Sequence, residues 1–161
     1  MKIGIITVSD SCSEGKREDK SGPLIRQMVE NLGEVVKHEI IPDEKASIGQ
    51  AIKESVDQLK ADLVFTTGGT GLSSRDVTPE ATGEVIEKEI PGFGEFMRQK
   101  SFEITPMAML SRAIAGTRGE SIIINLPGSP RAVKECLAII LPIALHGLDM
   151  IKGKGHPKGA K

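Results

Sequence analysis

Three short apolar runs rich in β-branched residues alternate with two amphipathic segments in the N-terminal part of the chain. The runs occupy 2–8, 34–41 and 62–67. Between them, apolar residues recur at helical spacing over 23–32 and 48–59. This strand–helix order predicts a parallel sheet with right-handed crossovers and helices on both faces. We therefore expect an α/β protein with three layers, α/β/α, and a mostly parallel sheet.

Polar residues predict where two of the helices begin. Ser47 and Gln50 match the capping-box pattern ahead of an apolar helical stripe. Thr78 and Pro79 are typical of the N-cap and the first residue of a helix, which we expect to run to about residue 89. In both cases a side-chain oxygen is expected to accept from an otherwise unpaired backbone N–H group.

The C-terminal half contributes a hairpin and a long helix. Residues 92–113 favour a partly helical segment that Pro106 interrupts. The apolar segments 113–117 and 121–126 favour a hairpin, which adds one antiparallel strand to the sheet. Ser129 and the proline after it are typical of the start of the last helix.

The length of 161 residues fits one domain, which we expect over 1–152, followed by a flexible basic tail over 153–161. The net charge of −1 disfavours a nucleic-acid partner held by a dominant positive field. No apolar run approaches the roughly 20 residues of a membrane span, and the first run is too short for a signal peptide. Two cysteines, Cys12 and Cys136, are too few for a disulfide framework and are expected to be reduced thiols. We expect a cytoplasmic protein without a membrane partner.

The third apolar run leads directly into the glycine-rich loop TTGGTG at 66–71. Gly68, Gly69 and Gly71 lack Cβ atoms, so backbone N–H groups can approach anionic oxygens closely. Thr67 and Thr70 add hydroxyl donors. A tight turn without a ligand is the alternative, but this combination in one strand-to-helix loop favours phosphate binding. The loop matches neither GxxxxGK[ST] nor GxGxxG, which disfavours an ordinary ATPase and a nicotinamide dehydrogenase.

Acidic residues follow at neighbouring strand ends. Asp43 follows the second run, and Asp76 lies beside Arg75 after the glycines. Carboxylates beside a phosphate repel it unless a divalent cation lies between them, and Mg²⁺ is the natural candidate. Singly, Asp43 is equally a turn residue and Asp76 equally a partner of Arg75, but as a pair they favour a metal–phosphate site. Asp10, in the loop after the first run, either reaches this site or stabilises its own loop.

The loop after the hairpin, PGSP at 127–130, has a similar composition. Pro127 and Gly128 form a rigid turn ahead of the Ser129 cap. Its backbone is suited to a second phosphate or to the edge of a flat ring, and a simple strand-to-helix turn is an equally good interpretation.

Taken together and in order, these loops resemble the molybdenum-cofactor biosynthesis family. The likeness extends from the first apolar run into the last helix and is closest to the molybdopterin adenylyltransferase branch, because IPDE and SRDVTPEAT carry both acids. The matching blocks are 66–71, 75–82, 91–95, 110–117 and 126–130.

This resemblance implies a transfer of AMP from MgATP to the terminal phosphate of molybdopterin, with release of pyrophosphate. It also implies a homotrimer and delivery of the product to a molybdate-inserting protein. Asp43 and Asp76 are the expected catalytic and Mg²⁺-binding residues. The other expected substrate- and nucleotide-binding residues are Ser9, Asp10, Ser11, Thr67, Gly68, Gly69, Thr70, Gly71, Arg75, Gly92, Glu95, Ser111, Pro127, Gly128 and Ser129.

Two other functions are compatible with the same motifs. One is a non-catalytic molybdopterin carrier or scaffold, as in the MoaB branch of the family. The other is a nucleotide hydrolase of the kind whose N-terminal domain shares the glycine motif. The acidic pair favours the adenylyl transfer over the carrier, and the hydrolase is disfavoured because we expect no additional catalytic domain.

Overall fold

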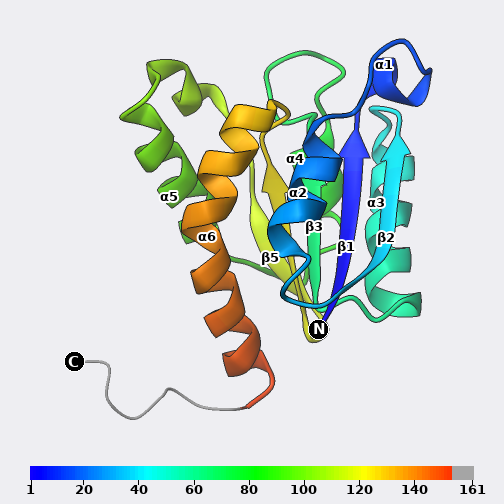
Figure 1. Cartoon of the computed structure of the whole chain (residues 1–161), viewed down its shortest axis with the longest axis vertical. Coiled ribbons are helices and arrows are strands. Elements are labelled where there is room, and N and C mark those ends of the chain that lie inside the picture. The colour runs from blue at the N-terminus through cyan, green and yellow to red at the C-terminus, as the bar shows by residue number, and fades with distance from the viewer. Residues whose placement is uncertain (154–161) are drawn as a thin grey trace.

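A six-stranded sheet forms the centre of the computed structural model, which describes residues 1–153 (Figure 1). The strand order is β2-β1-β3-β6-β5-β4, and one strand, β5, is antiparallel to both of its neighbours. This confirms a mostly parallel sheet with one antiparallel strand. The strands are β1 (Lys2–Val8), β2 (Glu34–Ile41), β3 (Leu63–Thr67), β4 (Lys88–Glu89), β5 (Ala115–Arg118) and β6 (Ser121–Leu126).

Helices pack on both faces of the sheet, as the strand–helix order predicts. One face is covered by α2 (Ser21–Val29), α5 (Pro91–Phe102) and α6 (Pro130–Ile151). The other is covered by α3 (Lys45–Lys53), the π-helical turn η1 (Glu54–Gln58) and α4 (Thr78–Gly83). Two short turns, α1 (Asp10–Ser13) and η2 (Pro106–Leu110), lie in loops. Over the described part of the chain, no helix has the length and apolar character needed to cross a bilayer.

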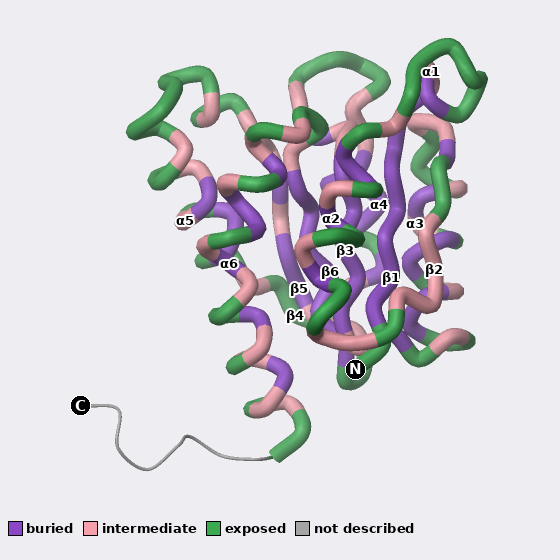
Figure 2. Tube along the Cα trace, viewed as in Figure 1, coloured by how far each residue is buried: buried purple, intermediate pink, exposed green. Residues whose placement is uncertain are grey.

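The central strands are buried on both faces because their side chains alternate between two apolar clusters (Figure 2). Along β1, Ile3 and Ile5 pack against α2 and α6, whereas Ile6 and Val8 pack against α3 and α4. This two-sided burial explains why the strands appear as continuous apolar runs in the sequence.

The core also contains a polar link between two strands and a helix. Asn125 of β6 is fully buried, and its Nδ2 donates to Thr66 Oγ1 of β3 at 2.9 Å and to Thr82 Oγ1 of α4 at 2.8 Å. Its Oδ1 accepts from the backbone N–H of Ile114 at 3.3 Å. The link fixes α4 against the strands whose ends carry the glycine loops.

Two predicted helix starts are wrong. The capping box at Ser47 does not form, because α3 begins at Lys45 and the Ser47 hydroxyl donates to the Glu44 carboxylate at 3.2 Å. Thr78 is the first residue of α4 rather than its cap, since its hydroxyl donates to the carbonyl of Gly68 at 2.9 Å. The helix also ends at Gly83, before the expected residue 89.

Two predictions concern the C-terminal part of the chain: the N-cap of the last helix, which is confirmed, and the basic tail. Ser129 caps α6 by accepting from the backbone N–H of Ala132 at 3.3 Å. The predicted basic tail at 153–161 lies, except for its first residue, outside the described residues.

Candidate functional site

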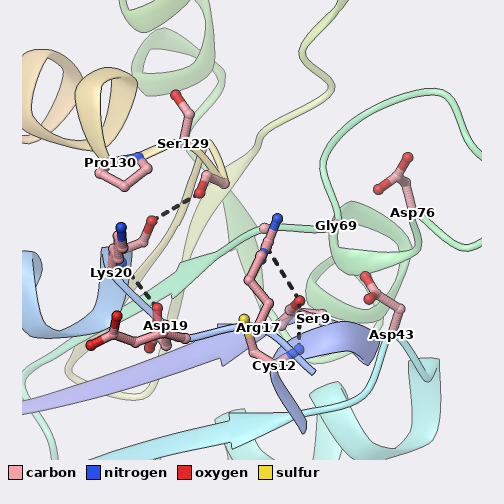
Figure 3. A pocket seen from close by; sticks show the side chains of 15 residues that line it. Ser9, Cys12, Arg17, Asp19, Lys20, Asp43, Gly69, Asp76, Ser129 and Pro130 are labelled. Carbon is pink, nitrogen blue, oxygen red and sulfur yellow. Dashed lines mark hydrogen bonds between the residues drawn. The ribbon is translucent and has the colours of Figure 1, made fainter. Parts of the chain in front are cut away.

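A cavity of about 690 Å³ opens at the carboxyl ends of the parallel strands. It lies where the strand order reverses, with β2 on one side of β1 and β3 on the other, which is the usual ligand position in open α/β sheets. Figure 3 shows its side chains converging from several loops. The sequence-predicted residues that line it are Ser9, Asp43, Gly68, Gly69, Asp76, Gly128 and Ser129.

The glycines of the third loop are required by their backbone and by their neighbours. Gly68 and Gly69 have φ angles of +98° and +63°, which side-chain-bearing residues rarely adopt. A Cβ at Gly68 would lie 2.2 Å from the carbonyl oxygen of Val8. A Cβ at Gly69 would lie 2.3 Å from the Thr78 hydroxyl and 3.0 Å from Asp43 Oδ1. The loop therefore presents bare backbone beside an acidic side chain.

The carboxylates of Asp43 and Asp76 enter the same cavity. Burial raises the pKa of Asp43, and the negative charges of Asp10 and Asp76 raise it further. Asp76 Oδ2 accepts from the backbone N–H of Ser73 at 2.8 Å. Within residues 1–153, Oδ1 of Asp43 and Oδ1 of Asp76 receive no hydrogen bond.

These two open carboxylate oxygens fit a magnesium ion. Two acids that repel each other across a cavity are stabilised by a divalent cation, and Mg²⁺ is usually held by one or two carboxylates together with substrate phosphates and water. The described residues contain no cluster of three or more His, Cys, Asp or Glu able to form a cage made of protein alone. The two acids therefore match the protein share of a site that a substrate phosphate and water would complete.

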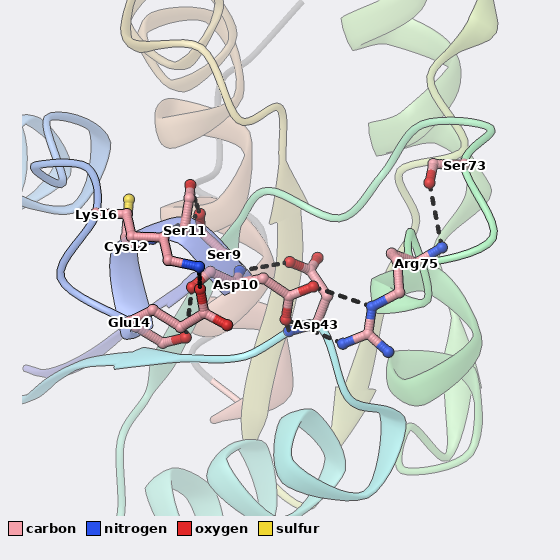
Figure 4. Close-up of polar contacts among 10 residues, drawn as sticks. Ser9, Asp10, Ser11, Cys12, Glu14, Lys16, Asp43, Ser73 and Arg75 are labelled. Atoms are coloured by element: carbon pink, nitrogen blue, oxygen red, sulfur yellow. Dashed lines mark hydrogen bonds and ion pairs between the residues drawn. The ribbon is translucent and has the colours of Figure 1, made fainter.

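Asp10 joins three of the loops at the rim (Figure 4). The Asp10 backbone N–H donates to Asp43 Oδ2 at 2.8 Å, and the Asp43 backbone N–H donates to Asp10 Oδ1 at 3.0 Å. The guanidinium of Arg75 donates twice to the Asp10 carboxylate, each time at 3.0 Å. The hydrogen bonds from Arg75, followed by that from Asp43, lower the pKa of Asp10. Arg75 therefore pairs with Asp10, not with Asp76 as the alternative interpretation held.

A basic segment that sequence reasoning missed also lines the cavity. Arg17 and Lys20 lie in the loop before α2, and Arg17 Nη2 is 3.5 Å from the hydroxyl of Ser9. In the sequence, charged residues in a loop look the same whether they bind a ligand or only face solvent. The one signal that could have indicated a binding role is their position in the loop that follows the first strand. Cys12, in the short turn α1, is a buried thiol in this wall.

Asp19 explains why this basic segment has a fixed path. Its buried carboxylate accepts from the Thr7 hydroxyl at 2.7 Å and from the backbone N–H groups of Ser21 and Gly22 at 2.9 and 3.1 Å. The Ser21 hydroxyl donates to the carbonyl of Gly128 at 2.8 Å. These bonds start α2 two residues before the expected Pro23 and connect the basic segment to the second glycine turn.

The remaining predicted residues lie outside the lining of this cavity. A second, mainly apolar cavity of about 500 Å³ is lined by Thr70, Gly71, Ser111 and Pro127. Glu95 lines a third, of about 470 Å³.

Three others have local contacts or open surroundings. Thr67 is buried and donates to the carbonyl of Pro127 at 2.7 Å. The Ser11 hydroxyl is 3.2 Å from that of Ser9. Gly92 is exposed in the first turn of α5, where a Cβ would meet no atom within 4 Å.

Known proteins resemble this chain over nearly its whole length. The family described as "Probable molybdopterin binding domain" matches residues 4–146. A molybdopterin adenylyltransferase from Helicobacter pylori J99 is 44% identical over 154 residues, which are 94% of this chain and 88% of that protein.

Solved structures give the same result. The molybdopterin biosynthesis enzyme MoaB from Thermus thermophilus has a TM-score of 0.88 at 43% identity, over 94% of this chain and 96% of that chain. The tungsten cofactor synthesizing protein MoaB from Pyrococcus furiosus has a TM-score of 0.87 at 44% identity, over the same shares. The chain described here therefore belongs to the family of molybdopterin-binding proteins of molybdenum-cofactor biosynthesis.

Proposed function

We propose that this chain is a molybdopterin adenylyltransferase, which transfers AMP from MgATP to the terminal phosphate of molybdopterin and releases pyrophosphate. The observation that carries the proposal is the pair of open carboxylates, Asp43 and Asp76, beside the bare backbone of Gly69. Lys20 lies across the cavity from them (Figure 3). The identity to the H. pylori enzyme supports the same activity.

The reaction requires the two substrates to be held in line, and it does not require a side chain activated as a nucleophile. The molybdopterin phosphate is itself the nucleophile, and it attacks the α-phosphorus of ATP in line with the departing pyrophosphate. Arg17, Lys20 and the backbone of Gly68 and Gly69 are placed to bind the phosphate oxygens. Asp43 and Asp76 would hold the Mg²⁺ ion, which would neutralise charge on the phosphates. Ser129 and Gly128 border the same cavity and orient the substrate from the β6 side.

Four further expectations belong to the proposal. Residues 1–152 act as one molybdopterin-binding domain. The chain assembles as a homotrimer and works in the cytoplasm. Its product passes to a molybdate-inserting protein.

The direct test is a reaction with purified components. Incubation of the protein with fresh molybdopterin and MgATP is expected to yield adenylylated molybdopterin and an equal amount of pyrophosphate. Asp76→Asn is expected to remove turnover while it leaves molybdopterin binding in place, because only the charge that holds the cation is lost. Asp57→Asn is the matched control, since Asp57 is exposed and pairs with Arg118 rather than lining the cavity. No product from intact pterin would refute the function.

A carrier function is the second candidate, because the resemblance left the MoaB branch open and two solved relatives at 43% and 44% identity bear that name. Calorimetric titration separates the two. A carrier binds molybdopterin without a Mg²⁺-dependent response to ATP, whereas the transferase binds the nucleotide in its presence.

A further inference from the structure

Arg112, between η2 and β5, binds both ends of the exposed loop that carries Asp76. Its Nε donates to the carbonyl of Gly71 at 2.7 Å, and its Nη2 donates to the carbonyl of Asp76 at 2.6 Å. Its backbone N–H donates to the carbonyl of Thr70 at 2.9 Å. Its Nη1 forms an ion pair with Glu80 in the first turn of α4. One side chain thus connects two points of the loop to the helix that follows.

Apart from Arg112, the loop is tied to the rest of the site by the ion pair between Arg75 and Asp10, which lies at the exposed rim. Leu72 and Arg75 are exposed, as are the two serines between them, so burial contributes little there. Bonds inside the loop, from the backbone N–H of Ser73 to Asp76 Oδ2 and from the backbone N–H of Asp76 to the Ser73 carbonyl, shape its tip. They do not fix the tip relative to the sheet.

The backbone on either side of Arg112 is held by Arg98. Arg98 of α5 donates from Nη1 to the carbonyls of Ser111 and Ala113, each at 3.2 Å. Arg98 of α5 thus holds the backbone on both sides of Arg112, whose side chain binds the Asp76 backbone.

We propose that Arg112 is a positioning residue for the transfer reaction, which holds the Asp76 carboxylate in the cavity that Asp43 also lines. The proposal rests on the proposed function, since it assigns Arg112 to the cation site of that reaction. A planar guanidinium reaches Gly71, Asp76 and Glu80 from three of its nitrogen-bound hydrogens, whereas a lysine ammonium is a single point. Arg112→Lys is therefore expected to recover only part of the function.

The test compares Arg112→Gln with Arg118→Gln. Arg118 is the matched control, because its side chain likewise combines a carboxylate partner, Asp57, with a backbone carbonyl, that of Val85, away from the cavity. Arg112→Gln is expected to lower kcat about 100-fold, the effect of misplacing a reacting group by roughly 1 Å, while KM for ATP changes far less. Arg118→Gln is expected to lower stability without this split.

A second readout follows the cation without turnover. Electron paramagnetic resonance of Mn²⁺ is recorded with α,β-methylene-ATP, an analogue that cannot be cleaved at the transferred bond. Arg112→Gln is expected to weaken Mn²⁺ binding as much as Asp76→Asn does, and the double variant is expected to lose no more than either single one. Additive losses, or an Arg112→Gln variant that matches Arg118→Gln, would overturn the positioning role.

The two proposals fail in different ways. A wild-type protein that makes no adenylylated product, but whose Mn²⁺ binding depends on Arg112 as on Asp76, refutes the transfer and keeps the positioning role at the cation site. An active wild type together with an unaffected Arg112→Gln variant supports the transfer and refutes the positioning role. A wild type that makes no product and binds no Mn²⁺ overturns both.

Discussion

At position 69, both the backbone conformation and the neighbouring side chains in the main cavity require glycine. The position has a φ of +63°, and any Cβ would collide with the Thr78 hydroxyl and approach Asp43. Gly119, in the β5–β6 hairpin, has a similar φ of +55° but nothing within 4 Å of a Cβ. A side chain at Gly119 would therefore cause backbone strain alone, whereas one at Gly69 would cause both strain and steric crowding.

We predict that Gly69→Ala loses adenylyl transfer and destabilises the protein by about 1 to 3 kcal/mol more than backbone strain alone does. Gly119→Ala is the control for that strain, which amounts to about 1 kcal/mol in a tolerant turn. Urea unfolding and the product assay measure the two effects. Equal losses of stability in both variants, with full activity in Gly69→Ala, would show that the crowding is unimportant.

Asp43 illustrates a conflict between stability and function. Burial raises its pKa above the aspartate reference value of 3.8, so the charged form is disfavoured in the folded state. The resulting penalty is present at neutral pH and disappears as the pH falls through the folded pKa to below 3.8.

We predict that Asp43→Asn raises the melting temperature by a few degrees at pH 7 and abolishes turnover. The amide oxygen can still accept the hydrogen bond from Asp10, while the buried charge and the cation ligand are removed. The gain in melting temperature is expected to vanish below pH 3.8. Thermal melts across this pH range are the measurement, and a lower melting temperature at pH 7 would contradict the argument.

At the scale of elements, α4 is held to the sheet through Asn125. We predict that Asn125→Ala destabilises the protein by about 3 kcal/mol, because the Thr66 and Thr82 hydroxyls and the Ile114 N–H group lose a buried partner. The control is Asn31→Ala at an exposed position, which is expected to stay within about 0.5 kcal/mol of the wild type. Denaturant unfolding measures both. A small effect at Asn125 would mean that the three groups find other partners.

The succession of strands and helices was predictable because it depends on local burial patterns. The runs at 2–8 and 34–41 coincide with β1 and β2. In β1 every residue after Lys2 is buried, whereas β2 lies at the edge of the sheet and only its last residue, Ile41, is buried. The failure at Ser47 has a local cause: its spacing to Gln50 fits the interior of a helix as well as its start.

The site was only partly predictable, because some of its members are selected by tertiary contact. Gly69 and Asp76 are indicated by the composition of their loop, whereas Arg17 has no local signal that distinguishes it from a solvated residue. The role of Arg112 depends on carbonyls 36 and 41 positions away in the chain. No pattern within one segment contains that information.

At the scale of the whole molecule, we predict a particle with three times the 17.2 kDa mass of one chain. A net charge of −1 gives little repulsion between copies. Large apolar side chains are also exposed over 102–110, among them Met107 and Leu110, and such area favours association. Light scattering coupled to size-exclusion chromatography at micromolar protein measures the mass. A particle of 17.2 kDa would refute the trimer.

The lining of the main cavity has an optical consequence. No aromatic residue is found among the described side chains that border it, and the whole sequence contains neither Trp nor Tyr. The protein is thus nearly transparent near 280 nm and has no indole or phenol emission. A pterin bound in this cavity is expected to report its surroundings through its own absorption and fluorescence, with no signal from the protein to subtract.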